Sequence, residues 1–169
     1  MQLPIGQTVV HPNHGIGKIT DVTKMDLVDE FKRYYVIDFV TKNLTSRIPI
    51  RKMEELKLRT TMSRAKVKKV FTALKAIPQG LPQDYKRRRA QLESEVHSGN
   101  PVKIANAVRE LTWRKENDRL STSDSRLLAK GREMLIEEIA LVTESETDEA
   151  IYRVDQALTA AIEAKQIEM

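Results

Sequence analysis

Apolar and polar residues alternate in short runs over the first third of the chain, a pattern typical of β-strands. Four segments are rich in β-branched and aromatic residues, namely TVVH, IGKITDV, FKRYYVIDFV and LTSRIPI, and we interpret HPNHG, KMDLVDE and TKN between them as turns. Gly15 and Gly17 stand where the second segment begins, and glycine there permits the bend that closes a small barrel. The pattern predicts four or five strands folded into a small β-barrel over residues 1–58.

The segment LTSRIPI carries two signs of an edge strand. Alternation places Arg47 on the outward face, and Pro49 lacks the backbone N–H that a central strand needs. Such an edge can be extended by a strand of another protein, with backbone bonds giving affinity. Alternatively, Pro49 and Arg47 protect the edge from such pairing. The residue pattern leaves both interpretations open.

After residue 60 the apolar spacing becomes helical. Start signals occur at Ser63, at Pro82 or Asp84, at Asn100 followed by Pro101, and at Ser121 with Asp124 three residues later, and TESETDEA begins a fifth helix. The expected inward stripes are Val67, Val70, Phe71 and Leu74, then Ile104, Ala107, Val108 and Leu111, then Leu128, Leu135, Ile139 and Val142, and finally Ile151, Val154, Leu158 and Ile162. The chain is therefore expected to be a two-domain α+β protein, with a bundle of about five helices over residues 62–165.

Positive charge gathers in the middle of the chain. Lys plus Arg against Asp plus Glu is 10 to 7 in residues 1–60, 13 to 4 in residues 61–115 and 6 to 13 in residues 116–169. A basic segment followed by an acidic one suits contact with a polyanion on one side only, although a solvated helical surface would look the same.

The segment GLPQDYKRRRAQL sets one aromatic residue, Tyr85, against four consecutive cations, Lys86 to Arg89. At about 100° per residue, Leu92 and Val96 share a helix face with Tyr85, which favours a core position for the ring. Alternatively, the ring projects past the core from the first turn, with Lys86 and Arg87 free to hold phosphates, as architectural DNA binders place a wedge beside cations.

No motif indicates an enzyme. The chain has no cysteine, GIGKI lacks a third glycine and a following helix, and no phosphate loop or nucleophile elbow occurs. His11 and His14 in HPNHG leave a metal ion short of ligands, so we interpret them as part of a turn, and we interpret His97 and Trp113 as structural. We therefore expect no metal and no cofactor. Without a long apolar stretch or a signal sequence, the chain is expected to be cytosolic.

Five segments together resemble the CarD/CdnL family of bacterial RNA polymerase-binding transcription regulators, and the resemblance covers almost the whole chain. They are IGQTVVHPNHGIGKI, LTSRIPI, VKKVFTALK, YKRRRAQLESEVHSGNPVKIANAVREL and LSTSDSRLLAKGREMLIEEIALV. In that family a Tudor-like barrel docks on the β-subunit lobe of RNA polymerase, partly by strand pairing. The helical domain contacts promoter DNA at the upstream edge of the melted bubble. The resemblance thus implies a monomeric regulator that stabilises the open complex, located in the cytoplasm on the nucleoid through RNA polymerase.

The resemblance also implies roles for particular residues. Arg47 matches an arginine used against polymerase, the strand from Thr45 through Ser46 to Ile48 lies in the same interface, and Lys24 and Met25 fall near a second contact. Tyr85 matches the wedge that enters the minor groove, with Arg87 and Arg88 as its basic companions and Lys86 beside them.

This chain departs from the family at two positions. Tyrosine stands where the wedge is usually tryptophan, which implies a smaller stacking surface, and Ser125 occupies a position that is often basic, which implies one phosphate contact fewer. The same barrel occurs in the transcription-repair coupling factor, a long motor protein, but this chain has no helicase motif. The alternative function is an adaptor that binds polymerase without contacting DNA.

Overall fold

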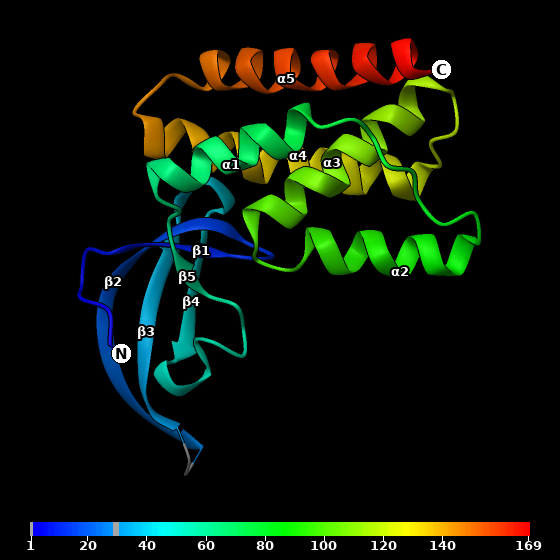
Figure 1. Ribbon diagram of the computed structural model, residues 1–169. Coiled ribbons are helices and arrows are strands. Elements are labelled where there is room, and N and C mark those ends of the chain that lie inside the picture. The colour runs from blue at the N-terminus through cyan, green and yellow to red at the C-terminus, as the bar shows by residue number, and fades with distance from the viewer. Residues whose placement is uncertain (1, 29–30) are drawn as a thin grey trace. The chain divides into compact units, whose positions relative to one another are not determined.

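The computed structural model describes residues 2–28 and 31–169 and divides the chain into two compact units, Met1–Thr61 and Met62–Met169 (Figure 1). The first unit contains strands and the second contains helices, so the α+β layout is confirmed. Within the part of the chain that the structure describes, no helix combines the length and the apolarity needed to cross a membrane.

The first unit is an antiparallel five-stranded sheet in the order β4-β3-β2-β1-β5. The strands are β1 (Thr8–His11), β2 (Gly15–Val28), β3 (Phe31–Phe39), β4 (Leu44–Pro49) and β5 (Arg59–Thr60), with 3-10 turns η1 (Val40–Lys42) and η2 (Ile50–Lys52) on either side of β4. Because β4 and β5 form the two edges and do not pair with each other in the described residues, the sheet is open. The expected Tudor-like barrel is therefore not confirmed.

One predicted turn was wrong. We expected KMDLVDE to separate two strands, but β2 continues through residues 24–28. The backbone of this polar stretch pairs with β3, where Lys24 lies opposite Arg33 and Val28 opposite Phe31, with a register shift between the two pairs. Backbone pairing with a long neighbouring strand, helped by a bulge, outweighs the turn propensity of the side chains. The last two residues of the segment, 29 and 30, lie outside the described residues.

The sheet unit has its own hydrophobic core. Its buried members are Val9, Ile19, Tyr35, Ile37, Phe39, Ile48 and Leu58. Gly17 on β2 faces Phe39, and a Cβ atom at Gly17 would lie 2.6 Å from that ring. Glycine is thus required at this position so that the aromatic ring can cover the strand.

The second unit contains five helices, as expected. They are α1 (Arg64–Lys75), α2 (Tyr85–Val96), α3 (Pro101–Glu116), α4 (Thr122–Thr143) and α5 (Thr147–Glu168). The predicted caps are confirmed, since the side chains of Ser63, Asp84, Asn100 and Ser121 each accept a backbone N–H of the helix that follows. Each cap satisfies a donor that the helix itself leaves without a partner.

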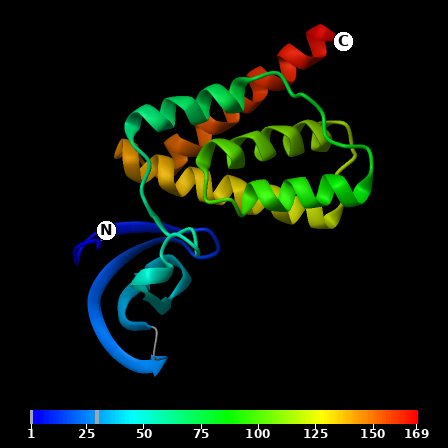
Figure 2. The same cartoon turned by 60° about the horizontal axis from the view of Figure 1, so that its bottom comes forward.

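Helix α3 is the centre of the helical unit. It packs against α1, α2, α4 and α5, and its residues Ile104, Ala107, Val108 and Leu111 are fully buried (Figure 2). Helix α2 packs against α3 and α4 and buries only Leu92 and Val96 completely. Most of α2 is therefore available to solvent.

Helices α3 and α4 are in close contact at Gly131. A Cβ atom at Gly131 would lie 2.8 Å from Cγ2 of Val108. We expect Gly131→Ala to lower the free energy of unfolding by about 1–3 kcal/mol, because the clash outweighs the better helix propensity of alanine. Chemical denaturation measures this loss. In a Val108→Ala background the same change should cost much less, and an equal cost in both backgrounds would contradict the packing explanation.

Candidate nucleic-acid and protein interfaces

Tyr85 is the first residue of α2 and its side chain is exposed. The Asp84 carboxylate accepts the backbone N–H of Arg87 at 3.0 Å and so fixes the start of the helix one residue before the ring. Tyr85 is 56% exposed, whereas Leu92 and Val96 on the same helix face are 0% exposed. The first turn of α2 extends beyond the core, although later residues on the same helix face are buried. The interpretation of Tyr85 as a core residue is therefore wrong.

The four cations that follow Tyr85 divide into two pairs. Lys86 and Arg87 are exposed, and the structure records neither an ion pair nor a side-chain hydrogen bond for them among the described residues. Arg88 and Arg89 are half-buried, and Arg89 pairs with Glu93 one turn later at 2.6 Å. Two positive side chains beside the ring are therefore free to meet an anion.

Arg88 contacts both the connection before α2 and the Tyr85 ring. Its Nη1 donates to the carbonyl oxygens of Pro82 at 3.2 Å and Gln83 at 3.1 Å. Its guanidinium carbon lies 5.6 Å from the centroid of the Tyr85 ring, within the range of a cation–π contact. Arg88 thus supports Tyr85 and the connection before it, in addition to carrying charge.

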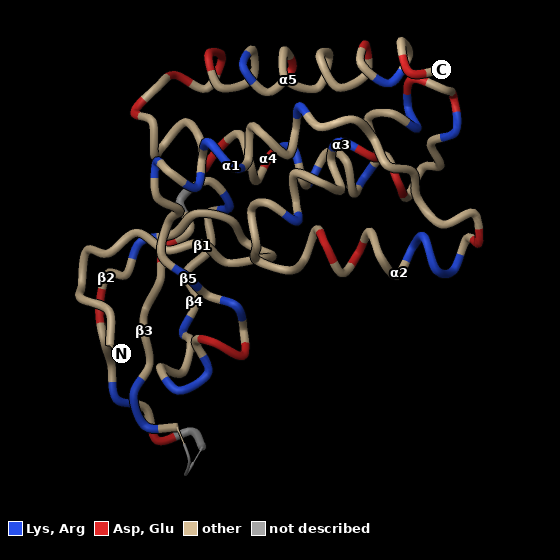
Figure 3. Tube along the Cα trace, viewed as in Figure 1, with Lys and Arg blue, Asp and Glu red and all other residues tan. Residues whose placement is uncertain are grey.

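The charges of α2 are arranged against the helix dipole. Lys and Arg occupy the amino-terminal half, and Glu93 and Glu95 occupy the carboxyl-terminal half (Figure 3). Cations in the first turn are unfavourable by about 0.3–1 kcal/mol each, because that end already carries positive partial charge. Burial, together with the nearby charge of Glu110, raises the pKa of Glu95, and a hydrogen bond from Gln91 offsets part of that rise. The cations in the first turn of α2 are stabilised when an anion binds at the start of this helix.

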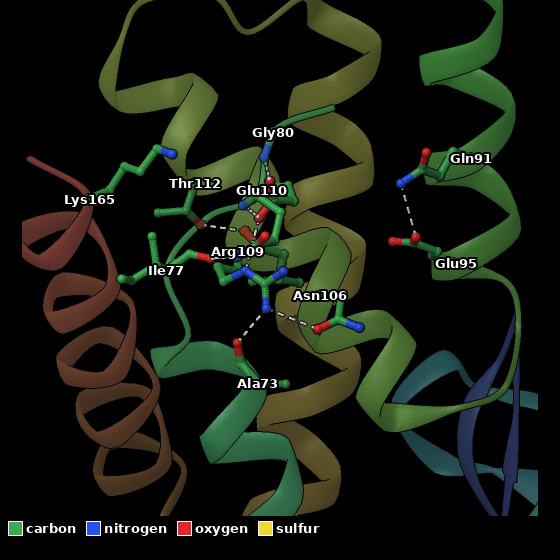
Figure 4. Close-up of polar contacts among 12 residues, drawn as sticks. Ala73, Ile77, Gly80, Gln91, Glu95, Asn106, Arg109, Glu110, Thr112 and Lys165 are labelled. Carbon is green, nitrogen blue, oxygen red and sulfur yellow. Dashed lines mark hydrogen bonds and ion pairs between the residues drawn. The ribbon is translucent and has the colours of Figure 1, made fainter. Parts of the chain in front are cut away.

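A buried ion pair on α3 holds the connection that leads into α2. The Glu110 carboxylate accepts the backbone N–H of Gln79 at 3.1 Å and that of Gly80 (Figure 4). Arg109 donates through Nε to Glu110 at 2.9 Å and through Nη1 to the carbonyl oxygen of Ala73 at 2.8 Å. The pair therefore ties the end of α1 and the following connection to α3.

Sequence reasoning missed this pair. Arg109 and Glu110 are 7% and 5% exposed, although neighbouring charged residues on a helix are usually solvated. The only available signal was their position next to Val108 and Leu111, inside the expected apolar stripe.

Strand β4 is the second candidate interface, and its place at the edge of the sheet confirms the prediction from Pro49. Thr45 and Arg47 are exposed, Ser46 is half-buried and Ile48 is buried, as the alternation predicted. Arg47 lies opposite Val36 of β3, so its side chain projects from the outward face. The edge is available for pairing with a strand of another protein.

Lys24 and Met25 lie on β2, away from this edge. Lys24 is exposed opposite Arg33 of β3, and Met25 is half-buried within the irregular part of the β2–β3 pairing. The structure therefore does not join them to Arg47 in one contiguous cluster along β4. Ser125 is exposed in the first turn of α4.

The turn interpretation of HPNHG is confirmed. The Nδ1 atom of His11 accepts the backbone N–H of Asn13 at 3.0 Å, and the His11 and His14 rings stack at 4.4 Å. Across residues 2–28 and 31–169, no three histidine or carboxylate side chains are grouped so that they could hold a metal ion.

Comparison with known proteins agrees with both units. A family model described as CarD-like/TRCF RID domain matches residues 3–62, and one described as CarD, C-terminal domain, matches residues 69–155. The chain belongs to the CarD family of transcription regulators associated with RNA polymerase. It is 25% identical over 138 residues to a Bacillus subtilis (strain 168) protein named "Putative transcription factor YdeB", which covers 82% of this chain and 90% of that one.

Removal of the buried carboxylate tests how the connection before α2 is held. We expect Glu110→Ala to lower the free energy of unfolding by about 3–5 kcal/mol, because Arg109 keeps its buried charge without its partner. Limited proteolysis should also cut within residues 77–83 faster. Glu93→Ala is the matched control, since it removes a carboxylate from a partly exposed pair with Arg89 and should cost about 1 kcal/mol or less. Equal losses for the two variants would contradict an anchoring role.

Proposed function

We propose that this protein docks on the β-subunit lobe of RNA polymerase through β4 and stabilises the promoter open complex through the start of α2. Arg47, Thr45, Ser46 and Ile48 form the polymerase contact, with Lys24 and Met25 as a second one. Tyr85, Lys86, Arg87 and Arg88 contact DNA at the upstream edge of the bubble, in its minor groove and at its phosphates. The family gives the association with polymerase, and the geometry of α2 supports the DNA contact.

The observation that carries the proposal is an exposed ring at a helix start, flanked by two free cations. With 56% of its surface exposed, Tyr85 contributes less to the core than a buried tyrosine would. Arg88 and Asp84 nevertheless hold the ring and the helix start in place. A ring fixed in this way can stack at an opened base step while Lys86 and Arg87 neutralise the adjoining phosphates.

The ring slows reannealing only while it contacts DNA. Stacking of an aromatic ring on a base contributes roughly 1–3 kcal/mol, which corresponds to about 5- to 150-fold in the lifetime of the open complex. We expect Tyr85→Ala to shorten the half-life of promoter complexes within that range, and Tyr85→Trp to lengthen it. Competitor challenge of preformed complexes measures the half-life.

Tyr152→Ala is the matched control for this experiment. Tyr152 is 62% exposed on α5 and shares no element with the proposed site. The Tyr152 variant should leave the half-life unchanged, and Tyr85→Ala should unfold at nearly the same temperature as the parent protein. An unchanged half-life for Tyr85→Ala would instead favour an adaptor that binds polymerase without contacting DNA.

Docking through β4 is tested by reversing the charge of its outward arginine. We expect Arg47→Glu to weaken binding to RNA polymerase by about 2 kcal/mol or more, roughly 30-fold, because a carboxylate then faces the acidic groups that complement Arg47. Titration against purified polymerase measures the affinity. Lys18→Glu makes the same change at an exposed position of the interior strand β2 and should have little effect. If the two variants bind alike, β4 is not the docking edge.

A further inference from the structure

One end of the helical unit brings together the start of α2, the end of α3 and the start of α4 (Figure 2). This end holds a pocket of about 340 Å³ that extends to the last turn of α5. Three cations line it, Arg114 from the last turn of α3, Arg119 from the α3–α4 connection and Lys165 from α5. Trp113 and Gln83 also line it, and Gln83 lies only two residues before Tyr85. We call this pocket the corner pocket.

Arg114 is fixed in the corner pocket by one hydrogen bond, and one of its N–H donors has no hydrogen-bond partner. Its Nη2 donates to the carbonyl oxygen of Arg119 at 3.1 Å, which fixes the guanidinium group. Its Nε is buried and has no hydrogen-bond partner. Burial lowers the pKa of Arg114, and the positive charges of Arg88 and Arg119 lower it further, whereas Asp124 opposes them. The Arg114 guanidinium group therefore lies near two other positive side chains, Arg88 and Arg119.

The negative groups around the corner pocket compensate this charge only in part, since Asp124 favours the charged form of Arg114 from a distance. The Glu110 carboxylate is already used by Arg109 and by two backbone N–H groups. Lys165 has a long ion pair with Glu168 at 3.8 Å, whereas neither Arg114 nor Arg119 forms an ion pair within the described ranges. A cluster of arginines without carboxylate partners is typical of sites that bind phosphate.

We propose that the corner pocket binds a phosphate group of the DNA strand that the start of α2 contacts, with Arg114 and Arg119 as its ligands. This inference rests on the proposed function and extends its contact surface from α2 to the α3–α4 connection. Gln83 links the two sites, because it lines the corner pocket and its carbonyl oxygen accepts a hydrogen bond from Arg88, which also contacts the Tyr85 ring. The half-buried indole of Trp113 provides an apolar wall beside the cations, as in sites that hold a nucleic-acid backbone with its sugar or base.

The chain carries its own reporter for this pocket, because Trp113 is its single tryptophan. We expect a forked DNA duplex to change Trp113 fluorescence in a saturable way. Arg119→Ala removes an exposed side chain, so the fold should persist, and it should weaken DNA binding about 5-fold. It should also reduce the slope of log affinity against log salt by about 1, the loss of one phosphate contact.

Lys103→Ala is the matched control, an exposed cation at the opposite end of α3. It should leave both the Trp113 signal and the salt slope unchanged. Arg114→Lys keeps the charge but loses the fixed guanidinium group, and it should weaken the Trp113 response without lowering the melting temperature appreciably. If Arg119→Ala and Lys103→Ala give the same salt slope as the parent protein, the corner pocket does not bind phosphate.

Two further experiments are needed. One distinguishes free phosphate from DNA phosphate as the ligand, and the other distinguishes failure of the corner pocket from failure of the proposed role of Tyr85. Inorganic phosphate and adenosine monophosphate are titrated alone, and a Trp113 response at lower concentration than that of DNA phosphates would overturn the assignment to DNA. Tyr85→Ala should retain the Trp113 response to DNA even though it shortens the lifetime of the open complex. A long-lived open complex without any Trp113 response would overturn the corner pocket alone. A Trp113 response lost in Arg119→Ala, with a lifetime independent of Tyr85, would overturn only the proposed function of the ring.

Discussion

One buried carboxylate anchors the connection that leads into α2. Glu110 accepts two consecutive backbone N–H groups of the connection after α1, and Arg109 compensates its charge while also binding the end of α1. A connection with two prolines and a glycine would otherwise sample many conformations, and the start of α2 would move with it. Burying the ion pair costs desolvation free energy, but it gives the connection a defined conformation. The position of the Tyr85 ring is thereby fixed as well.

The start of α2 is arranged for a ligand that the protein itself does not supply. Cations stand where the helix dipole is positive, Arg88 and Arg114 repel each other, and a tyrosine ring is exposed to water. Each of these features lowers the stability of the isolated protein a little, and an anionic partner with a flat apolar face relieves all three at once. The CarD family is associated with RNA polymerase, and the promoter DNA proposed above as the ligand of this surface is such a partner.

The helices were predictable from sequence because their signals are local. Caps such as Asn100 with Pro101 act over three residues, and the apolar stripe of α3 follows from its spacing alone. The extension of β2 was missed because its polar residues pair through backbone with a strand that follows them, and side-chain pattern carries no record of such pairing. The aromatic and cationic residues near Tyr85 could be recognised from the sequence. Whether the ring lies in the core could not be predicted, because that depends on how far the helical bundle extends. Arg114 and Arg119 were not recognised, because only the packing of α2, α3 and α4 brings the end of α3 near Arg88.

The contact between Gly131 and Val108 has a mechanical consequence. Only glycine leaves room for that valine, and every neighbouring position on α4 carries a side chain, so α4 cannot slide along α3 by one residue without a collision. The two helices are consequently locked in axial register. A change of register between α3 and α4 would therefore require the two helices to separate first.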